Sequence, residues 1–393
     1  MSKMLRVVSL VLAFGVLPPT MAQKKSSDAS VSGIPMEQLK AFAETYWQIK
    51  RNYVDQVDDK QLLEGAINGM LKSLDSYSGY LNEEDLQDLQ VSSEGFYDGL
   101  GVEVVAENKS IRVVSIISNS PAERAGIQKD DIIVAVDHKR VDEEGPELVI
   151  DSMRGVAGES VELEILAQGK GEPVIHRLTR ETLELKSIAV EEMAEGVWHV
   201  SIKMFQRDTG YELEKELLAA ARDKPINGMI LDLRNNPGGV LKAAVDVVDL
   251  MLDSGIIVST EGRTRESFQK YFANPGDVLE QVPLVVLINE NSASASEIVA
   301  GALQDHKRGV ILGSPSYGKG VVQSIMPLQQ NAAIKLTTSR YLTPTGRSIH
   351  GKGIQPDIAV SAEDAEKEAE DRVLTTAHRT LVKKLPQSLA KLP

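Results

Sequence analysis

The chain of 393 residues contains no cysteine. This absence excludes disulfide bonds, a thiolate nucleophile and any zinc site built on cysteine. It also excludes the diacylated lipoprotein class, whose members need a cysteine at the mature N-terminus. An exported form of this chain would depend on its hydrophobic core alone for stability.

Positive charge is also scarce. Lysine and arginine total 43 residues against 57 aspartates and glutamates, which gives a formal net charge of −14. Nucleic acids and anionic membranes are bound through basic faces, so neither is expected as a partner.

No apolar run near the N-terminus is long enough to span a bilayer. Two basic residues precede an apolar run at 7–17, and Thr-Met-Ala at 20–22 matches a cleavage signal. We therefore predict a signal peptide at 1–22, a disordered polar leader at 23–34, and an exported, periplasmic protein. The alternative is an uncleaved anchor, which would leave the protein peripheral to a membrane.

Residues 35–94 have a helical pattern, because apolar side chains recur there at three- and four-residue spacing. The sequence Leu-Asp-Ser-Tyr-Ser at 74–78 interrupts this pattern. An amphipathic segment of this kind serves equally well as a small helical subdomain or as a dimerisation or docking element, and both alternatives stay open.

Residues 95–182 change to short strands separated by glycine turns and two short helices. The sequences at 99–104 (Gly-Leu-Gly-Val-Glu-Val), 120–126 and 128–133 occur in the order and spacing that resemble a PDZ domain. A glycine turn leaves backbone N–H groups free for a terminal carboxylate, and the strand after it can pair with an extended peptide. Leu100, Gly101 and Val102 are the predicted peptide-binding residues.

Residues 183–360 alternate between strand and helix patterns, which predicts an α/β core with partly parallel strands. The expected strands are 196–202, 228–233, 283–289, 309–313, 321–327 and 333–338, and the expected helices are 212–222, 240–252 and 295–304. Residues 361–393 form a helical tail, in which the charged pattern at 363–385 is interpreted as a solvated helix.

Three of the expected strands end in unusual loops, and ligands of α/β sheets bind at the carboxyl ends of strands. One loop carries Gly238 and Gly239, the second carries Ser294 before a helix, and the third carries Lys319 between two glycines. N–H groups at a helix start are unpaired, so the Ala295 N–H and those of the glycine loop could hold an oxyanion.

A serine nucleophile needs a base, and no histidine lies in a glycine-rich loop at the carboxyl end of a strand. A buried lysine can be that base when its pKa falls far enough to leave the amine neutral. Ser292 and Ser296 are interpreted as helix-capping residues, although helix position alone does not separate them from Ser294.

At this point the chain resembles the carboxyl-terminal processing peptidases, also called tail-specific proteases. The motifs are Leu-Asp-Leu-Arg-Asn-Asn-Pro-Gly-Gly at 231–239, Ser-Ala-Ser-Ala-Ser-Glu-Ile at 292–298 and Tyr-Gly-Lys-Gly-Val-Val-Gln at 317–323. The resemblance implies a ClpP/crotonase-like α/β protease core preceded by a helical segment and a PDZ domain. It further implies these roles: Ser294 as nucleophile, Lys319 as general base, Gln323 as the residue that positions the lysine, and Gly238 and Ala295 as oxyanion donors, with Gly239 the near alternative to Gly238. No metal or cofactor is implied.

The resemblance also implies how substrates arrive. The PDZ domain would recognise protein or peptide C-termini, and Arg154 matches an arginine that couples the PDZ domain to the active site. Homo-oligomers and a lipoprotein adaptor are further implied partners. The chain departs from the family at 74–81, where no Pro-His follows Leu-Asp, and we expect this departure to lie far from the chemistry.

The predicted function is a periplasmic serine endopeptidase that cleaves substrates recognised near their C-termini. The alternative, from another class, is a catalytically silent PDZ scaffold.

Overall fold

The computed structural model describes residues 35–107, 109–329, 331–360 and 371–384. The predicted signal peptide and leader lie outside these residues. Within the described ranges, no helix is both long enough and apolar enough to cross a membrane. The chain divides into two units, Met1–Ala66 and Ile67–Pro393, which are described separately.

The first unit contains α1 (Met36–Asn52) and the beginning of α2 (Asp59–Lys72). Tyr46 Oη and Lys50 Nζ both reach the Asp59 carboxylate, at 2.7 and 2.6 Å. No side chain of α1 is buried, and its apolar side chains Leu39 and Trp47 are 43% and 67% exposed. The apolar stripe predicted from the sequence therefore forms no core within this unit.

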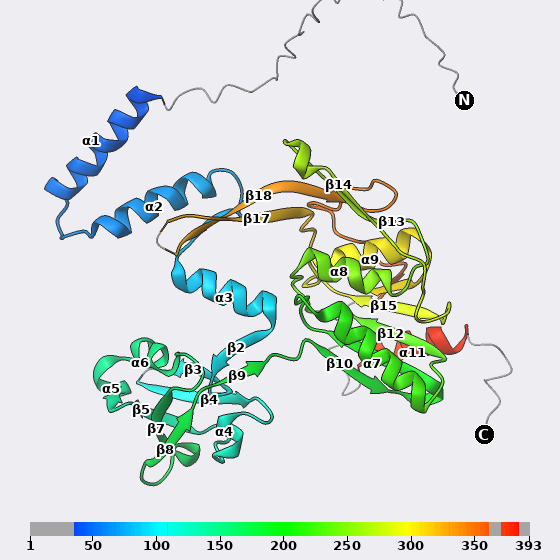
Figure 1. Ribbon diagram of the computed structural model, residues 1–393, viewed down its shortest axis with the longest axis horizontal. Helices are drawn as coiled ribbons and strands as arrows, with labels where there is room; N and C mark the ends of the chain where they lie inside the picture. The colour runs from blue at the N-terminus through cyan, green and yellow to red at the C-terminus, as the bar shows by residue number, and fades with distance from the viewer. Residues whose placement is uncertain (1–34, 108, 330, 361–370, 385–393) are drawn as a thin grey trace, which may run out of the picture. The chain divides into compact units, whose positions relative to one another are not determined.

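The PDZ-type part of the second unit is built on an antiparallel sheet in the order β3-β4-β5-β7-β8, with β6 on β5, and a separate β2–β9 pair leads into and out of it (Figure 1). The strands are β2 (Phe96–Gly99), β3 (Val102–Glu107), β4 (Ser110–Ile116), β5 (Ile132–Val136), β6 (Lys139–Arg140), β7 (Ser160–Leu166), β8 (Val174–Thr179) and β9 (Glu181–Glu184). The helices are α4 (Pro121–Arg124), α5 (Val141–Glu144), α6 (Pro146–Met153) and the 3₁₀ turn η1 (Ala167–Gly169). Alternate residues of β4, β5 and β7 point into one core. In the sheet order, β3 has β4 as its one neighbour, so β3 is an edge strand.

The α/β core is a six-stranded sheet in the order β10-β11-β12-β15-β16-β19, parallel except for β10. Its strands are β10 (Ile188–Glu192), β11 (Val197–Ile202), β12 (Gly228–Asp232), β15 (Leu284–Ile288), β16 (Val310–Gly313) and β19 (Ile358–Ala359). Every residue of β12 and β15 is buried. Strands are apolar throughout when helices cover both faces of a parallel sheet, and that is the arrangement here.

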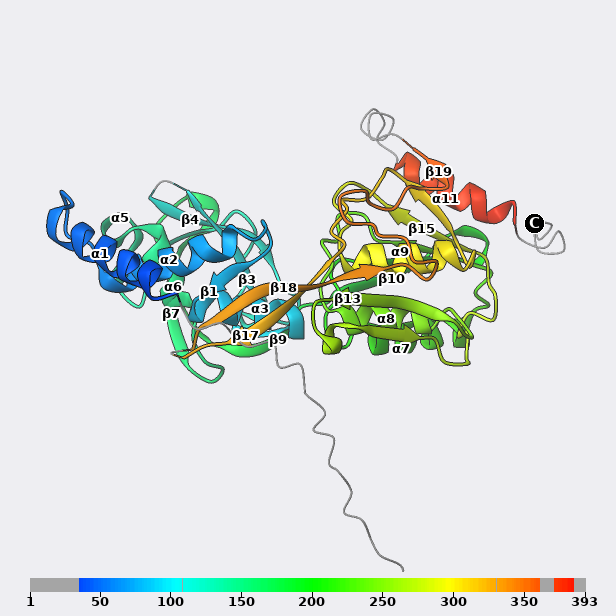
Figure 2. The same ribbon diagram turned by 90° about the horizontal axis from the view of Figure 1, so that it is seen from above.

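The two faces are covered by different helices, as Figure 2 shows. Met229 and Leu231 pack with α7 (Thr209–Asp223), α8 (Leu241–Asp249) and α9 (Ala295–Asp305). Ile230, the residue between them, packs with α11 (Arg372–Val382) on the opposite face. The predicted multidomain α/β fold is confirmed.

The C-terminal tail differs from the sequence interpretation. Val373, Ala377 and Leu381 of α11 are buried against the parallel sheet. Their spacing of four residues forms an apolar stripe that the surrounding charges obscured. The interpretation of a fully solvated tail helix was therefore wrong for residues 372–382, while 361–370 and 385–393 lie outside the described residues.

A second, antiparallel sheet joins a strand near the start of the second unit to four strands that lie much later in the sequence. Its order is β1-β18-β13-β14, with β17 also on β18. The strands are β1 (Gly79–Leu81), β13 (Ile256–Gly262), β14 (Gln269–Phe272), β17 (Val321–Pro327) and β18 (Ala333–Leu342), with 3₁₀ turns η2 (Ala194–Gly196) and η3 (Arg265–Ser267) elsewhere. Outside the PDZ part, the sequence analysis missed β1, β10, β13, β14 and β19.

Between β1 and the PDZ part lies α3 (Glu83–Glu94), which begins with a capping box between Asn82 and Asp85 and ends at Gly95 in the left-handed region.

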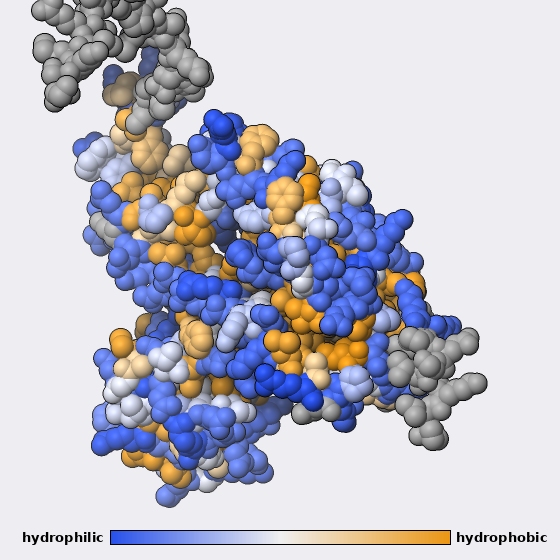
Figure 3. Space-filling view, turned by 45° about the vertical axis from the view of Figure 1, so that its right-hand side comes forward, coloured by the Kyte–Doolittle hydropathy of each residue, from blue (hydrophilic) through white to orange (hydrophobic). Residues whose placement is uncertain are grey.

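The face drawn in Figure 3 is mostly hydrophilic, with hydrophobic side chains in separate patches, in keeping with a chain in which 25% of residues are charged.

Candidate active site

One cavity of about 350 Å³ brings the three predicted loops together. Its lining includes all six residues predicted for the chemistry: Ser294, Ala295, Lys319, Gln323, Gly238 and Gly239. The loops follow β12, β15 and β16, which are adjacent parallel strands, so their carboxyl ends meet at one edge of the sheet.

Ser294 lies at the turn between β15 and the first residue of α9. Its backbone has φ +54° and ψ −111°, a conformation that L-residues seldom adopt. Such strain persists only where the surroundings enforce it, and it is common where a nucleophile sits on a sharp strand-to-helix turn. A Cβ on Gly238 would lie 2.7 Å from the Ser294 Cβ, so glycine is required where the two loops touch.

The neighbouring serines have structural roles, but the interpretation of Ser292 and Ser296 as helix caps was wrong, because Ser294 is the N-cap residue of α9. Ser292 Oγ donates to the Leu233 carbonyl at 2.8 Å, and Ser296 Oγ donates to the Asn236 carbonyl at 3.0 Å. Both are fully buried, whereas Ser294 is half-buried and faces the cavity. The structure therefore separates Ser294 from its neighbours, which helix position alone did not do.

The Glu297 carboxylate connects the serine turn to the lysine loop. Its Oε2 accepts the N–H groups of Ser294 and Lys319 at 2.9 and 2.8 Å, and its Oε1 accepts the Gly318 N–H and the Ser316 hydroxyl at 2.7 and 2.6 Å. The side chain is completely buried, and these four donors take the place of water. The sequence analysis quoted Glu297 within a motif but gave it no role.

Lys319 is half-buried, and its two flanking glycines explain how its loop is shaped. Gly318 has φ +92°, and a Cβ on Gly320 would lie 2.5 Å from the backbone nitrogen of His350. Burial, and then the charge of Lys335, lower the pKa of the Lys319 ammonium below its ordinary value, while Glu297 opposes the shift. The surroundings of Lys319 thus lower its pKa, which is the change that a lysine needs to act as a base.

Gln323 reaches the cavity through an irregularity in the strand pairing. The β17–β18 register shifts between Val322 and Gln323, and a bulge of this kind redirects a side chain. Gln323 Nε2 is buried and has no hydrogen-bond partner among the residues that the structure describes. Among the described residues, no hydrogen bond joins Lys319 Nζ to Ser294 or Gln323; catalytic hydrogen bonds often form only when substrate is bound.

The glycine loop is held by Asn236, which is fully buried. Its Nδ2 donates to the Ile202 carbonyl and its Oδ1 accepts the Gly238 N–H, both at 2.8 Å. Among the described residues, the N–H groups of Gly239 and Ala295 have no acceptor. The Gly238 N–H would have to leave Asn236, or share it, to serve an oxyanion, so the observed state favours Gly239 as the second donor.

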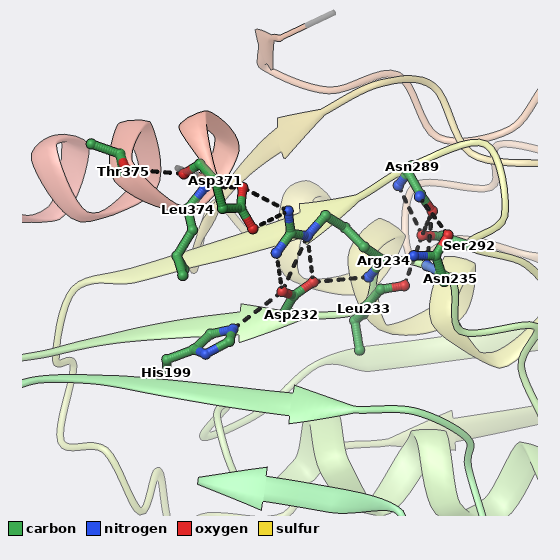
Figure 4. Close-up of polar contacts among 10 residues, drawn as sticks. All are labelled: His199, Asp232, Leu233, Arg234, Asn235, Asn289, Ser292, Asp371, Leu374 and Thr375. Carbon is green, nitrogen blue, oxygen red and sulfur yellow. Dashed lines mark hydrogen bonds and ion pairs between the residues drawn. The ribbon is translucent and has the colours of Figure 1, made fainter. Parts of the chain in front are cut away.

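Behind this loop, Arg234 joins the α/β sheet to α11 (Figure 4). Its guanidinium pairs with Asp232 at 2.5 Å and with Asp371 at 2.8 Å, and Asp232 also contacts His199 at 3.1 Å. Burial favours the neutral acid, but the hydrogen bond to His199 and the charge of Arg234 outweigh it and lower the pKa of Asp232 to about 2.

Figure 4 also shows a link between the glycine loop and the serine loop. Asn235 and Asn289 exchange two hydrogen bonds, at 2.9 and 2.8 Å, which tie the glycine loop to the start of the serine loop. No cluster of three or more metal-ligating side chains occurs in the described part of the chain.

Comparisons with known proteins agree with this organisation. Residues 196–360 match the model of peptidase family S41, residues 99–174 match the PDZ domain, and residues 17–85 match the N-terminal domain of the activating protease CtpB. A carboxy-terminal-processing protease of Bartonella bacilliformis is 42% identical over 335 residues, which are 84% of this chain and 77% of that protein. The chain belongs to the carboxy-terminal-processing proteases of family S41.

Two further relatives show how far the similarity extends. A probable CtpA-like serine protease of Staphylococcus epidermidis is 35% identical over 339 residues, covering 84% of this chain and 67% of that protein. A solved structure from Bacteroides fragilis, designated an S41 protease, shares the fold at 15% identity with a TM-score of 0.51, over 85% of this chain and 92% of the other. Its membership of family S41 and its match to the PDZ domain make the protease a serine-type peptidase with a PDZ domain.

Two of the three predicted peptide-binding residues of the protease line a separate cavity of about 960 Å³. Leu100 and Val102 line it from the turn and edge strand β3, opposite Ile150 and Met153 of α6. Gly101, at φ +83°, shapes the turn between them. An edge strand beside a helix is the arrangement to which an extended peptide adds as a further strand.

Arg154 of the protease contacts α3 rather than the catalytic residues. Its guanidinium pairs with Asp88 at 2.9 Å and Glu84 at 3.5 Å. The helix α3 lines the PDZ cavity through Asp88 and neighbouring residues, and it lines the catalytic cavity through Leu89, Ser92 and Ser93. One helix therefore borders both cavities.

The departure from the family at 74–81 does not lie far from the chemistry, and that expectation was wrong. The Tyr77 ring centroid is 5.4 Å from Lys319 Nζ. The approach depends on the pairing of β1 with β18, which no local pattern in the sequence revealed.

Proposed function

We propose that the protease is an exported, periplasmic endopeptidase that cleaves protein substrates recognised near their C-termini. The observation that carries the catalytic part is the shared cavity, in which Ser294 lies on a strained turn beside a half-buried lysine of lowered pKa. The S41 membership of the chain supports the same chemistry.

In the proposed mechanism, neutral Lys319 accepts the proton of Ser294 Oγ as the oxygen attacks a peptide carbonyl carbon. The N–H groups of Ala295 and Gly239 stabilise the oxyanion. The Lys319 ammonium then protonates the leaving amine, and water, deprotonated by the lysine, hydrolyses the acyl-enzyme. Gln323, whose buried Nε2 has no partner in the described part of the chain, would orient the lysine amine or the substrate backbone.

Delivery of substrate is proposed to involve the PDZ cavity and α3. A C-terminal peptide added along β3 would lie against α6 and α3, and the Arg154 ion pairs would pass a change at the groove to α3. Because α3 also lines the catalytic cavity, its displacement would alter access to Ser294.

Oligomerisation is proposed to use the exposed apolar stripe of α1, since Leu39 and Phe42 are 43% and 46% exposed. Light scattering on the purified protein should show a multimer that Phe42→Glu converts to a smaller species; an unchanged mass would remove this role. An adaptor that delivers substrates is compatible with the same surface.

The test of function compares wild type, Ser294→Ala, Lys319→Ala and the surface control Ser254→Ala on an unfolded protein with a free C-terminal tail. Cleavage should be lost in the first two variants and retained in the control, which is exposed in the loop before β13. Equal cleavage by wild type and Ser294→Ala would contradict the assignment.

A further inference from the structure

An aromatic ring from the segment before β1 lies over the amine of Lys319. The Tyr77 ring centroid is 5.4 Å from Lys319 Nζ, within the roughly 6 Å over which a cation is attracted to the face of a ring. Among the described residues, Nζ makes no hydrogen bond and no ion pair. The ring is thus the contact through which the protein holds the end of this side chain.

The position of Tyr77 is fixed by hydrogen bonds of Asp75 and Ser78 and by the pairing of β1 with β18. Asp75 Oδ1 accepts the N–H groups of Tyr77 and Ser78 at 2.8 and 2.7 Å, which forms a tight turn. Ser78 Oγ then accepts the Thr337 N–H at 3.2 Å, and Gly79 pairs with Lys335 as β1 joins β18. The turn is anchored to the strand that forms one wall of the catalytic cavity.

Other charged and titratable groups face this pair from each neighbouring element. Lys335 on β18 lowers the pKa of Lys319, and Glu297 on α9 opposes that effect. Burial raises the pKa of the Tyr77 hydroxyl, as does nearby Tyr317, so this hydroxyl stays neutral. His350 packs edge-on to the Tyr77 ring, with centroids 6.1 Å apart.

We propose that Tyr77 is a positioning residue for the base, and that its ring face holds the ammonium form of Lys319 and releases the neutral amine. This inference rests on the proposed role of Lys319. A ring face attracts the ammonium but not the amine, so the contact weakens when Lys319 gives its proton to solvent. The freed amine can then turn to Ser294 Oγ. In the cycle the lysine passes the serine proton to the leaving amine and later returns a proton from water to Ser294 Oγ, and the ring contact forms again when solvent protonates the resting amine.

The ring also sets the pH at which the base becomes available. Burial and Lys335 favour the neutral amine, whereas the ring favours the ammonium. The ring therefore keeps the pKa of Lys319 from falling as far as its burial alone would take it. This balance retains a lysine that can protonate a leaving amine as well as accept a proton from serine.

The test is the pH dependence of kcat/KM for wild type, Tyr77→Phe and Tyr77→Leu on a short peptide substrate. Tyr77→Phe keeps the ring face, so its acid limb should match that of wild type. Tyr77→Leu should move the midpoint of the acid limb to lower pH by about half a unit to one unit.

Acid limbs that coincide for wild type and Tyr77→Leu would overturn the proposal. A Tyr77→Phe variant as impaired as Tyr77→Leu would also overturn it, because the hydroxyl would then be the important group. If Tyr77→Leu folds poorly, fluorinated phenylalanines at position 77 keep the shape of the ring while withdrawing electron density from its face. The midpoint should fall stepwise with the number of fluorines, and a constant midpoint would contradict the inference.

Parallel assays of Lys319→Ala and Ser294→Ala separate this inference from the proposed function. If these two variants retain activity, the proposed dyad fails whatever Tyr77 does. If they are inactive while Tyr77→Leu behaves as wild type, the dyad stands and only the role of Tyr77 fails.

Discussion

Replacing Glu297 with glutamine should damage the active site more than any single change outside the dyad. The carboxylate is fully buried and accepts four hydrogen bonds that hold the Ser294 turn against the Lys319 loop. A glutamine of the same shape has one oxygen and one NH₂ group. Whichever way it is oriented, the NH₂ group faces two donors instead of accepting from them.

The magnitude follows from the bonds lost. A hydrogen bond to a charged group contributes about 1.5–3 kcal/mol, so losing two should lower the unfolding free energy by about 3–6 kcal/mol. Natural domains have only about 5–15 kcal/mol in total. A displacement of about 1 Å between nucleophile and base costs on the order of 100-fold in rate, so kcat/KM should fall by at least that factor.

The assay measures kcat/KM and urea unfolding for Glu297→Gln beside the matched control Glu290→Gln. Glu290 also links the same two loops, through Ser314 at 3.0 Å, but it is exposed. The control should leave both quantities close to those of wild type. A Glu297→Gln protein with kcat/KM within about twofold of the control would refute the reasoning, because misplacement of the loops is predicted to cost far more.

Three other changes have defined outcomes. Asp232→Asn should lower the unfolding free energy by about 2 kcal/mol at neutral pH, because folding shifts the Asp232 pKa from 3.8 to about 2. Since folding lowers this pKa, the contribution is present above pH 3.8 and disappears towards pH 2. Urea unfolding curves of wild type and variant that differ equally at pH 7 and pH 2 would contradict this prediction. Arg154→Ala should reduce the preference for tail-bearing over tailless substrate, measured as a ratio of kcat/KM values, whereas Arg177→Ala on β8 should not, and equal ratios would remove the α3 route. Activity should rise with pH as Lys319 loses its proton, and Lys335→Gln should move this rise to higher pH because it removes the charge that lowers the Lys319 pKa; a profile that is flat, or unmoved by Lys335→Gln, would count against Lys319 as the base.

Much of the core could be predicted because its signals are local. β12 and β15 are apolar at nearly every position, and each ends at a loop whose composition is unusual. The carboxyl ends of adjacent parallel strands must meet, so the strand and loop patterns were enough to place Ser294 and Lys319 together.

The parts that were missed depend on distant pairing. Ser78 bonds to Thr337, 259 positions away, and only this pairing brings Tyr77 to the lysine. β13 has its polar residues together in its second half and pairs with β18, while β14 is mostly exposed and pairs with β13. The apolar stripe of α11 consists of only three residues, Val373, Ala377 and Leu381. Their contribution to the core is evident only from their packing against the sheet.

Glu297 shows a different limit. A glutamate three residues into a helix normally indicates a capping box, which is a local explanation that suffices from the sequence. Its three contacts with residues 316–319 come from a loop beyond the helix and the next strand. The tertiary contacts, rather than the motif, reveal that it organises the site.

Transfer of an acyl group from substrate to Ser294 Oγ is the step on which every role in the cavity depends. The most direct measurement is mass spectrometry of the full-length protein, quenched during turnover of a peptide ester and then digested. The prediction is an acyl adduct on Ser294 in wild type that forms faster as pH rises and is absent from Lys319→Ala. An adduct on another residue, or active protein with no adduct at Ser294 under conditions where acylation outpaces hydrolysis, would contradict the proposed mechanism.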